Sequence, residues 1–244
     1  TPWYLFEDTI QIAQYRNTQA IAALDLGANI IQYGDARIGL RYGYTSFELL
    51  SGIPQFPARR NTNIGAVNAQ LTLDRLDSLN FTHSGYRVLA QAYSSMSALG
   101  ADDEYAYWRG LASGAKTWGA HTVEGLVTAG NRIGGSDIPP YDLFNLGGFL
   151  YLSGLQRQQL KTQDFVFGRL VYRTKLAAIP FFEGIYVGAS AEAARLKPEV
   201  PVWEGERVDG YLNVTAGSLY FGLDSPLGPN RLARAAHRQQ RHPR

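Results

Sequence analysis

Residues 36–45 read ARIGLRYGYT, a stretch in which large apolar side chains alternate with charged or very small ones. Successive side chains of a β-strand point to opposite faces, so one face of this strand would carry Ile38, Leu40, Tyr42 and Tyr44. The other face would carry two arginines and two glycines. The stretch therefore predicts an extended strand with one apolar face and one polar face.

The same period of two recurs along most of the chain and predicts an all-β protein. The clearest further strands are expected at Ala20–Tyr33, Thr62–Arg75, Gly85–Ala98, Phe165–Lys175 and Gly210–Phe221. Weaker candidates are Trp3–Arg16, Glu104–Trp118, Ala120–Thr128, Phe149–Leu155 and Gly184–Ala193. Together these give about 11 strands, or about 12 with a damaged last one.

The length and the polar face of these strands favour a transmembrane antiparallel β-barrel. Soluble sandwiches use strands of about 5 or 6 residues, whereas strands of about 12 residues suit a tilted membrane crossing. The apolar face would meet lipid, and the polar face would meet water or a polar plug. Aromatic residues near strand ends suit the interfacial girdles: Trp3, Tyr4, Tyr33, Trp108 and Trp118. A soluble β-sandwich with sugar-binding loops is the alternative, which extraction into water without detergent would support.

Composition excludes several other classes. The 244 residues include no Cys, and the most apolar run, Leu146–Leu155, is too short for a transmembrane helix and holds three glycines. The mean hydropathy of -0.20 is compatible with a barrel. Five of the arginines lie in Arg231–Arg244, and without them the formal charge of +2 becomes −3. No basic face indicates nucleic acid as a partner.

The expected connections are unequal at the two ends of the barrel. Short links at 34–35 and 118–119 alternate with longer loops at Ser51–Asn61 and Gly130–Asn145. Short turns at one end and long loops at the other are typical of outer-membrane barrels. With the strands listed above, the long link Ala194–Asp209 falls at the short-turn end and breaks the rule.

The turn before the strand at 85–98 carries a recognisable motif. Asp74, Asp77, Phe81 and Gly85 match the pattern Asp-x-x-Asp-x-x-x-Phe-Pro-x-x-Gly, with Thr82 in place of the proline. This resembles the signature of the bacterial surface antigen barrels, the outer-membrane assembly and secretion superfamily. Aspartates can cap a turn by accepting backbone N–H groups, and a glycine permits positive φ at the strand start.

A second resemblance lies in Asn145–Leu155, which contains Gly147, Gly148 and Phe149, and in the following Phe167-Gly168-Arg169. Barrels of this superfamily carry an inward-folded loop with an Arg-Gly-Phe/Tyr tip here, and Gly147 stands where that arginine would be. The departure resembles the branch in which the barrel follows a patatin-like phospholipase domain. Tyr186–Glu192 and the stretch from Gly217 to Pro229 fit the same branch.

The resemblance also implies how the domain is bounded. The family barrel has sixteen strands, and placing the 147–149 loop before the twelfth makes Trp3–Arg16 the fifth. Residues 1–229 would then be a partial barrel whose first strands are missing from this chain. Residues 230–244 read as an aberrant basic tail, unsuited to a lipid-facing strand, and a frameshift at the gene end is one hypothesis for it.

No catalytic, cofactor-binding or metal-binding residue is expected. The Gly-x-Ser-x-Gly motif of patatin-like enzymes is absent, because the segment Gly188–Glu192 lacks the closing glycine. The four histidines have no metal-ligand spacing. The chain itself is therefore expected not to be an enzyme, although its full-length parent would be a lipid acyl hydrolase.

Three functions are considered, the first two of which follow from the resemblance. The first is a membrane anchor and translocation unit for a patatin-like phospholipase. The second is an outer-membrane protein assembly or secretion factor, against which the missing loop arginine argues. The third is a passive pore. The expected location is the bacterial outer membrane. The expected partners are outer-membrane lipid, the barrel assembly machinery and, as a further candidate, a second copy of the chain in a homodimer.

Overall fold

The computed structural model describes residues 2–7, 10–52, 59–78, 81–134, 136–179, 182–198, 210–225 and 228–242. They form a 12-stranded antiparallel sheet in which strands follow their order in the chain and β8 pairs beside β9. The strands are β1 (Pro2–Glu7), β2 (Ile10–Ile31), β3 (Gly34–Ser51), β4 (Arg59–Asp74), β5 (Gly85–Ser95), β6 (Tyr105–Trp118), β7 (His121–Ile133), β8 (Phe144–Leu146), β9 (Leu160–Ile179), β10 (Phe182–Pro198), β11 (Tyr211–Ser225) and β12 (Gly228–His242). A 3₁₀ turn, Ser97–Leu99, lies between β5 and β6.

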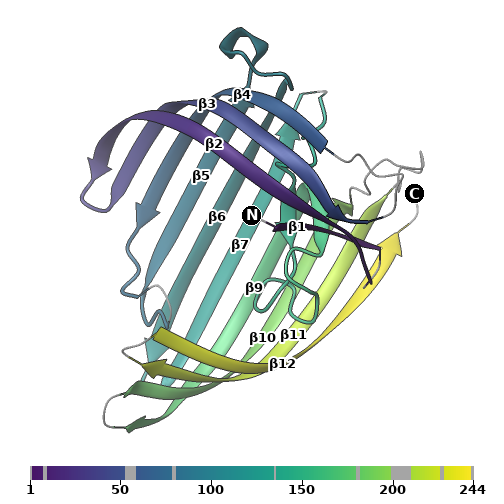
Figure 1. Ribbon diagram of the computed structural model, residues 1–244. Coiled ribbons are helices and arrows are strands. Elements are labelled where there is room, and N and C mark those ends of the chain that lie inside the picture. The colour runs from purple at the N-terminus through teal and green to yellow at the C-terminus, as the bar shows by residue number, and fades with distance from the viewer. Residues whose placement is uncertain are drawn as a thin grey trace.

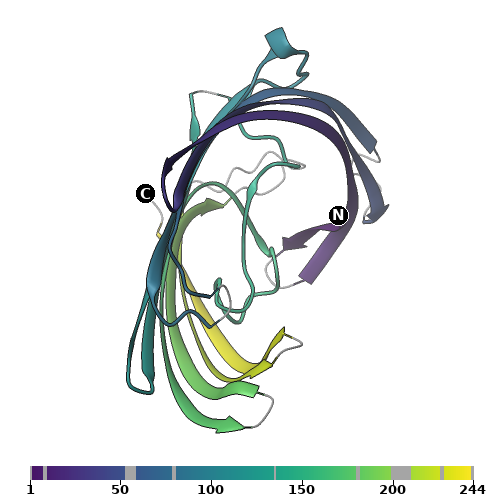
Figure 2. The same ribbon diagram turned by 90° about the vertical axis from the view of Figure 1, so that its left-hand side faces the viewer.

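The sheet curls into a trough rather than a closed cylinder (Figure 1). Among the described residues β1 and β12 form the two edges and do not pair with each other. The chain between β7 and β9 lies on the concave side, where the sheet curves around it (Figure 2). The expected all-β transmembrane barrel is therefore confirmed, in the form of a partial barrel.

The outer face is apolar, as the alternation predicts. In the β2–β3 ladder Leu24 lies opposite Leu40 and Leu26 opposite Ile38, and these side chains are exposed, Leu24 to 67%. On the concave face of the same strands Arg41 pairs with Asp25 at 2.8 Å. A methyl group on Gly39 would lie 1.9 Å from Asp25 Oδ1, so this glycine makes room for the ion pair.

The apolar outer row has the height of a membrane. On β2 it runs from Ala20 to Ile30, which is ten residue steps. At about 3.3 Å per residue and a tilt of about 40°, this row spans about 25 Å, the height of the lipid-facing band of outer-membrane barrels. Among the described residues no helix is long and apolar enough to cross a membrane.

Two strand assignments made from the sequence are wrong. The candidate Trp3–Arg16 is split between β1 and the start of β2, which continues to Ile31 as one strand of 22 residues. Phe149–Leu155 is a compact turn, because Leu150 and Leu152 adopt positive φ between three glycines that do the same. Because Phe149–Leu155 is not a strand, each later strand runs in the direction opposite to the one expected from the sequence. The link between β10 and β11 therefore lies at the end of the barrel that has the long loops. The expected exception to the short-turn rule at 194–209 is thus removed.

The end of the chain also differs from the expectation. Residues 228–242 form β12 and pair along the whole of β11, whereas a basic tail was expected over residues 230–244. The free edge of β11 offers backbone donors and acceptors to any extended segment, whatever its side chains. The register places Arg234 opposite Leu219 and Arg238 opposite Thr215, on the outward face. The hypothesis that a frameshift produced this basic stretch stays a prediction.

A charge on the outer row should be costly. We expect Leu26→Arg to destabilise the barrel in lipid by about 2–4 kcal/mol, because the guanidinium would enter hydrocarbon. Urea unfolding in lipid vesicles, followed by tryptophan fluorescence, measures this. Asn29→Arg is the control, since its side chain faces inward beside Asp35 of β3. Equal destabilisation by both variants would contradict the assignment of the faces.

Candidate functional site in the barrel interior

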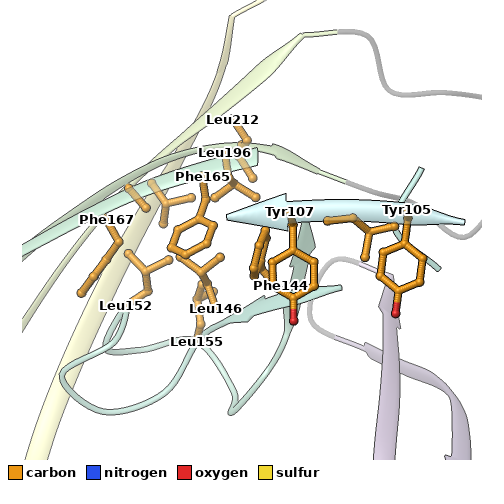
Figure 3. Packing of buried hydrophobic residues seen from close by; sticks show 13 residues of the cluster. Tyr105, Tyr107, Phe144, Leu146, Leu152, Leu155, Phe165, Phe167, Leu196 and Leu212 are labelled. Carbon is orange, nitrogen blue, oxygen red and sulfur yellow. The ribbon is translucent and has the colours of Figure 1, made fainter. Parts of the chain in front are cut away.

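The residues between β7 and β9 fold into the trough and pack there; we call residues 136–159 the inward segment. Its strand β8 pairs with the start of β9. Leu146, Leu152 and Leu155 pack against Phe165 and Phe167 of β9 in a buried cluster (Figure 3). The cluster extends to Leu196 of β10 and Leu212 of β11. The concave side therefore holds an apolar core, where only water or a polar plug was expected.

The turn at Gly147-Gly148-Phe149 begins the compact part of the inward segment. Gly147 has φ +122°, and a methyl group on it would lie 2.4 Å from Gln156 O. Its N–H donates to Tyr151 O at 3.0 Å, and the Tyr151 N–H donates to Gly148 O at 3.0 Å. The Phe149 ring, 40% exposed, meets the Tyr220 ring edge to face at 5.7 Å. Position 147, where the family loop carries arginine, thus has no room for a side chain.

An arginine on the barrel wall holds this turn. Arg169 of β9 donates from Nη1 to Leu150 O at 2.9 Å. From Nη2 the same guanidinium contacts Glu124 Oε1 of β7 at 2.5 Å. A charge-assisted hydrogen bond of this kind is about twice as strong as a neutral one. The positive charge of this contact thus belongs to Arg169 on the barrel wall, and the inward segment contributes only the backbone carbonyl of Leu150.

Glu124 is shared with a second wall arginine. Its Oε2 lies 3.2 Å from Nη1 of Arg173, whose side chain is 2% exposed. Arg173 also donates to the carbonyl of Thr82 and lies over the Phe81 ring, with Cζ 5.7 Å from the centroid. One carboxylate therefore compensates two arginines, one reaching the inward segment and the other reaching the turn between β4 and β5.

That turn is shaped by the aspartates that the sequence singled out. Asp77 accepts the N–H groups of His83 at 2.9 Å and Ser84 at 3.0 Å. Burial raises the pKa of the Asp77 carboxyl, but these backbone hydrogen bonds outweigh it and lower the pKa below its usual value. Asp74 accepts the Leu76 N–H at 3.2 Å and contacts Arg87 at 3.3 Å.

Two further motif residues turn the chain inward. Gly85 has φ +109°, and a methyl group on it would lie 2.0 Å from Arg75 O. Phe81 is fully buried and stacks on Tyr186 of β10 with centroids 4.7 Å apart. The motif therefore caps a turn whose aromatic residue is inserted into the trough.

A second carboxylate on the wall binds the inward segment. Glu192 of β10, which is buried, accepts the N–H and the hydroxyl of Ser153, each at 2.6 Å. It also accepts the Ser190 hydroxyl at 2.5 Å. The Ser153 hydroxyl oxygen accepts the Leu150 N–H at 2.9 Å. The inward segment is thus fixed by Arg169 on β9 and by Glu192 on β10.

The structure brings the two sequence motifs into one network. Asp74, Asp77, Phe81 and Gly85 shape one turn; Gly147, Gly148 and Phe149 shape the other; Arg169 links the second to Glu124. Gly168 is not closely packed against this network, because a methyl group added to it would lie no closer than 3.9 Å to its nearest neighbour, Leu126 O. The sequence reasoning did not identify Glu124, Arg173 and Glu192 as site residues. The sequence feature that could have identified them is a charged residue at an inward position of an alternating strand.

A group of carboxylate or histidine side chains could also hold a metal ion. Within the described ranges, no group of three or more His, Cys, Asp or Glu side chains is placed to hold a metal ion. The charged groups are paired with one another or with backbone atoms.

A long-stranded antiparallel sheet with an apolar outer face, paired charges inside and a segment folded into its lumen defines an outer-membrane β-barrel protein. The model of the Omp85 superfamily domain matches residues 3–237, so the chain belongs to the Omp85 superfamily. The outer-membrane location expected from the sequence is confirmed. Barrel domains of this superfamily are not enzymes, which is consistent with the expectation that this chain carries no catalytic residue.

Among solved structures, the chain is similar to BamA from Haemophilus ducreyi lacking POTRA domains 1-3, with a TM-score of 0.69 and 15% sequence identity. The match covers 92% of this chain and 51% of that one, so the chain spans about half the length of that relative. A likeness at this identity shows the shared fold. No curated protein matches the chain.

Loss of the shared carboxylate should destabilise the interior. We expect Glu124→Gln to lower the free energy of unfolding by about 3–5 kcal/mol, because Arg169 and Arg173 would stay buried without their counter-charge. Denaturant unfolding in vesicles gives the value. The control is Asp137→Asn, which breaks the more exposed pair with Arg132 and should cost about 1 kcal/mol or less. A small effect of Glu124→Gln would refute the shared role.

The two adjacent glycines allow a matched comparison. Gly147→Ala and Gly148→Ala both place a methyl group at a positive φ, but only at Gly147 does it collide with a backbone oxygen; at Gly148 the nearest atom is 3.7 Å away. We therefore expect Gly147→Ala to expose the inward segment to protease well before Gly148→Ala does. Equal digestion rates in membranes would contradict this geometry.

Proposed function

We propose that the chain is the membrane anchor and translocation barrel of a patatin-like phospholipase of the outer membrane. The observation that carries the proposal is that position 147 has no room for a side chain. Gly147, Gly148, Phe149 and Ser153 belong to the stretch that resembles the patatin-linked branch. At Gly147 the structure supports a physical reason for this departure, because the chain passes there with no room for the family arginine.

The way the inward segment is held supports an anchor. Arg169 binds Leu150 O and Glu192 binds Ser153 twice, while apolar residues of the same segment pack on β9. Breaking these contacts would remove two hydrogen bonds from the buried Glu192 carboxylate, which is costly. A segment fixed in this way favours a filled lumen over an open channel, and therefore argues against a passive pore.

The test is acyl hydrolysis by the full-length protein in washed outer membranes of a Gram-negative host. We expect ester hydrolysis to co-sediment with the membranes and to be released in soluble form when the barrel is deleted. Absence of hydrolysis from the intact protein would overturn the proposal.

A second function, assembly or secretion of other proteins, is favoured by the likeness to BamA, whose fold the chain shares. It predicts a different phenotype: depletion of the full-length protein would lower the abundance of other outer-membrane proteins. Under the anchor proposal their abundance stays unchanged.

Conductance in planar bilayers provides a further prediction. The full-length protein should show little conductance, because the inward segment fills the trough. Arg169→Gln combined with Glu192→Gln should raise it, since both charged holds on the segment are removed. Arg132→Gln, at the exposed pair with Asp137, is the control. A large conductance in the unaltered protein would instead favour the pore.

A further inference from the structure

A cavity of about 510 Å³ lies between the concave wall of β4–β7 and the inward segment. Gln70, Gln91, Arg109 and Thr128 line it from the wall, and Asp142 and Tyr151 line it from the segment. Cavities of about 300–1,000 Å³ are the size of small-molecule sites. This one takes no part in the network around Glu124.

Arg109 is held in place at the wall of this cavity by a chain of hydrogen bonds. Its Nε donates to Gln91 Oε1 at 2.5 Å, and Gln91 Nε2 donates to Asn68 Oδ1 at 2.5 Å. The three residues come from the neighbouring strands β6, β5 and β4. Because Nε is engaged, the planar guanidinium is oriented and its two Nη groups remain to meet a ligand.

Arg109 differs in this respect from other inward-facing arginines. Arg41, Arg169 and Arg173 each form an ion pair with a carboxylate. In the described part of the chain no carboxylate lies within 4 Å of Arg109. Asp142, on the opposite side of the cavity, acts on Arg109 electrostatically but forms no direct ion pair with it. The oriented guanidinium is therefore still able to bind a carboxylate with two parallel hydrogen bonds.

The remaining walls would suit an apolar body. Tyr107, Phe144, Tyr151 and Phe165 all line the cavity, and Tyr107 and Phe144 meet edge to face with centroids 5.3 Å apart. Aromatic walls with a few fixed polar groups are the usual composition of a small-molecule site. Asp142, whose Oδ2 accepts the Tyr105 hydroxyl at 2.9 Å, adds a negative charge on the segment side.

We propose that this cavity binds a small carboxylate with an aromatic or aliphatic body. The carboxylate pairs with the Nη groups of Arg109, and the body lies against Tyr107 and Tyr151. Asp142 opposes the ligand's charge and so limits its affinity. Burial raises the pKa of the Asp142 carboxyl to about 6, partly offset by the hydrogen bond from Tyr105, the positive charge of Arg109 and a hydrogen bond from Tyr107. The opposition of Asp142 therefore weakens as the pH falls through that range.

The test uses the full-length protein purified from outer membranes in detergent, with 3-phenylpropionate as the probe in titration calorimetry. We expect saturable binding to the unaltered protein and a loss of affinity of about tenfold or more in Arg109→Gln, the value of a charge-assisted bond. The matched control is Arg41→Gln, an inward arginine already paired with Asp25, which should stay within about twofold of the unaltered protein. Asp142→Asn should bind more tightly.

Several results would overturn the proposal. One is equal binding of the neutral analogue 3-phenylpropanol, which would remove the role of the guanidinium. Another is equal binding of inorganic phosphate, which would remove the role of the apolar body. Lack of saturable binding to the unaltered protein, or equal losses in Arg109→Gln and Arg41→Gln, would contradict the site itself. Heat-modifiable mobility on gels verifies that each variant is folded.

Discussion

In the core of a bilayer the backbone of a strand can be satisfied only by neighbouring strands, and the rest of this structure depends on that constraint. Each long strand from β2 to β11 is paired on both sides. Once the ladders fix the register, the period of two decides which side chains meet lipid and which face the concave side. The outer row of β2 and β3 and the Asp25–Arg41 pair behind it are consequences of the same register.

The concave side is organised by a smaller number of strong contacts. Two segments fold into it from opposite ends of the strands: the turn carrying Phe81 and the inward segment. Glu124 joins them through Arg173 and Arg169, and Glu192 adds a second hold on Ser153. Because these groups lie away from water, each is stabilising only while its partner is present. The interior therefore behaves as one unit rather than as separate loops.

Much of the fold could be predicted from alternation alone, because a strand that separates lipid from a lumen must alternate. The class of protein, the outward rows of β3 and β9, and the capped turn at Asp77 all follow from local pattern. Phe149–Leu155 was misassigned, since a run of apolar residues between glycines fits a strand and a buried turn equally well. The partners of Glu124 depend on which strands are neighbours, which no local pattern contains. For the same reason the pairing of β12 could not be read from its basic sequence.

On β3 the even-numbered residues from Ile38 to Tyr44 face acyl chains, and the odd-numbered residues face the lumen. This chain has no cysteine, so single cysteines at positions 37–44 can carry a fluorescent label in the full-length protein once any cysteine outside this chain is replaced. Quenching by brominated lipids measures contact with hydrocarbon at each position. We expect strong quenching at 38, 40, 42 and 44 and weak quenching at the positions between them. Uniform quenching, or the opposite alternation, would refute this orientation of β3.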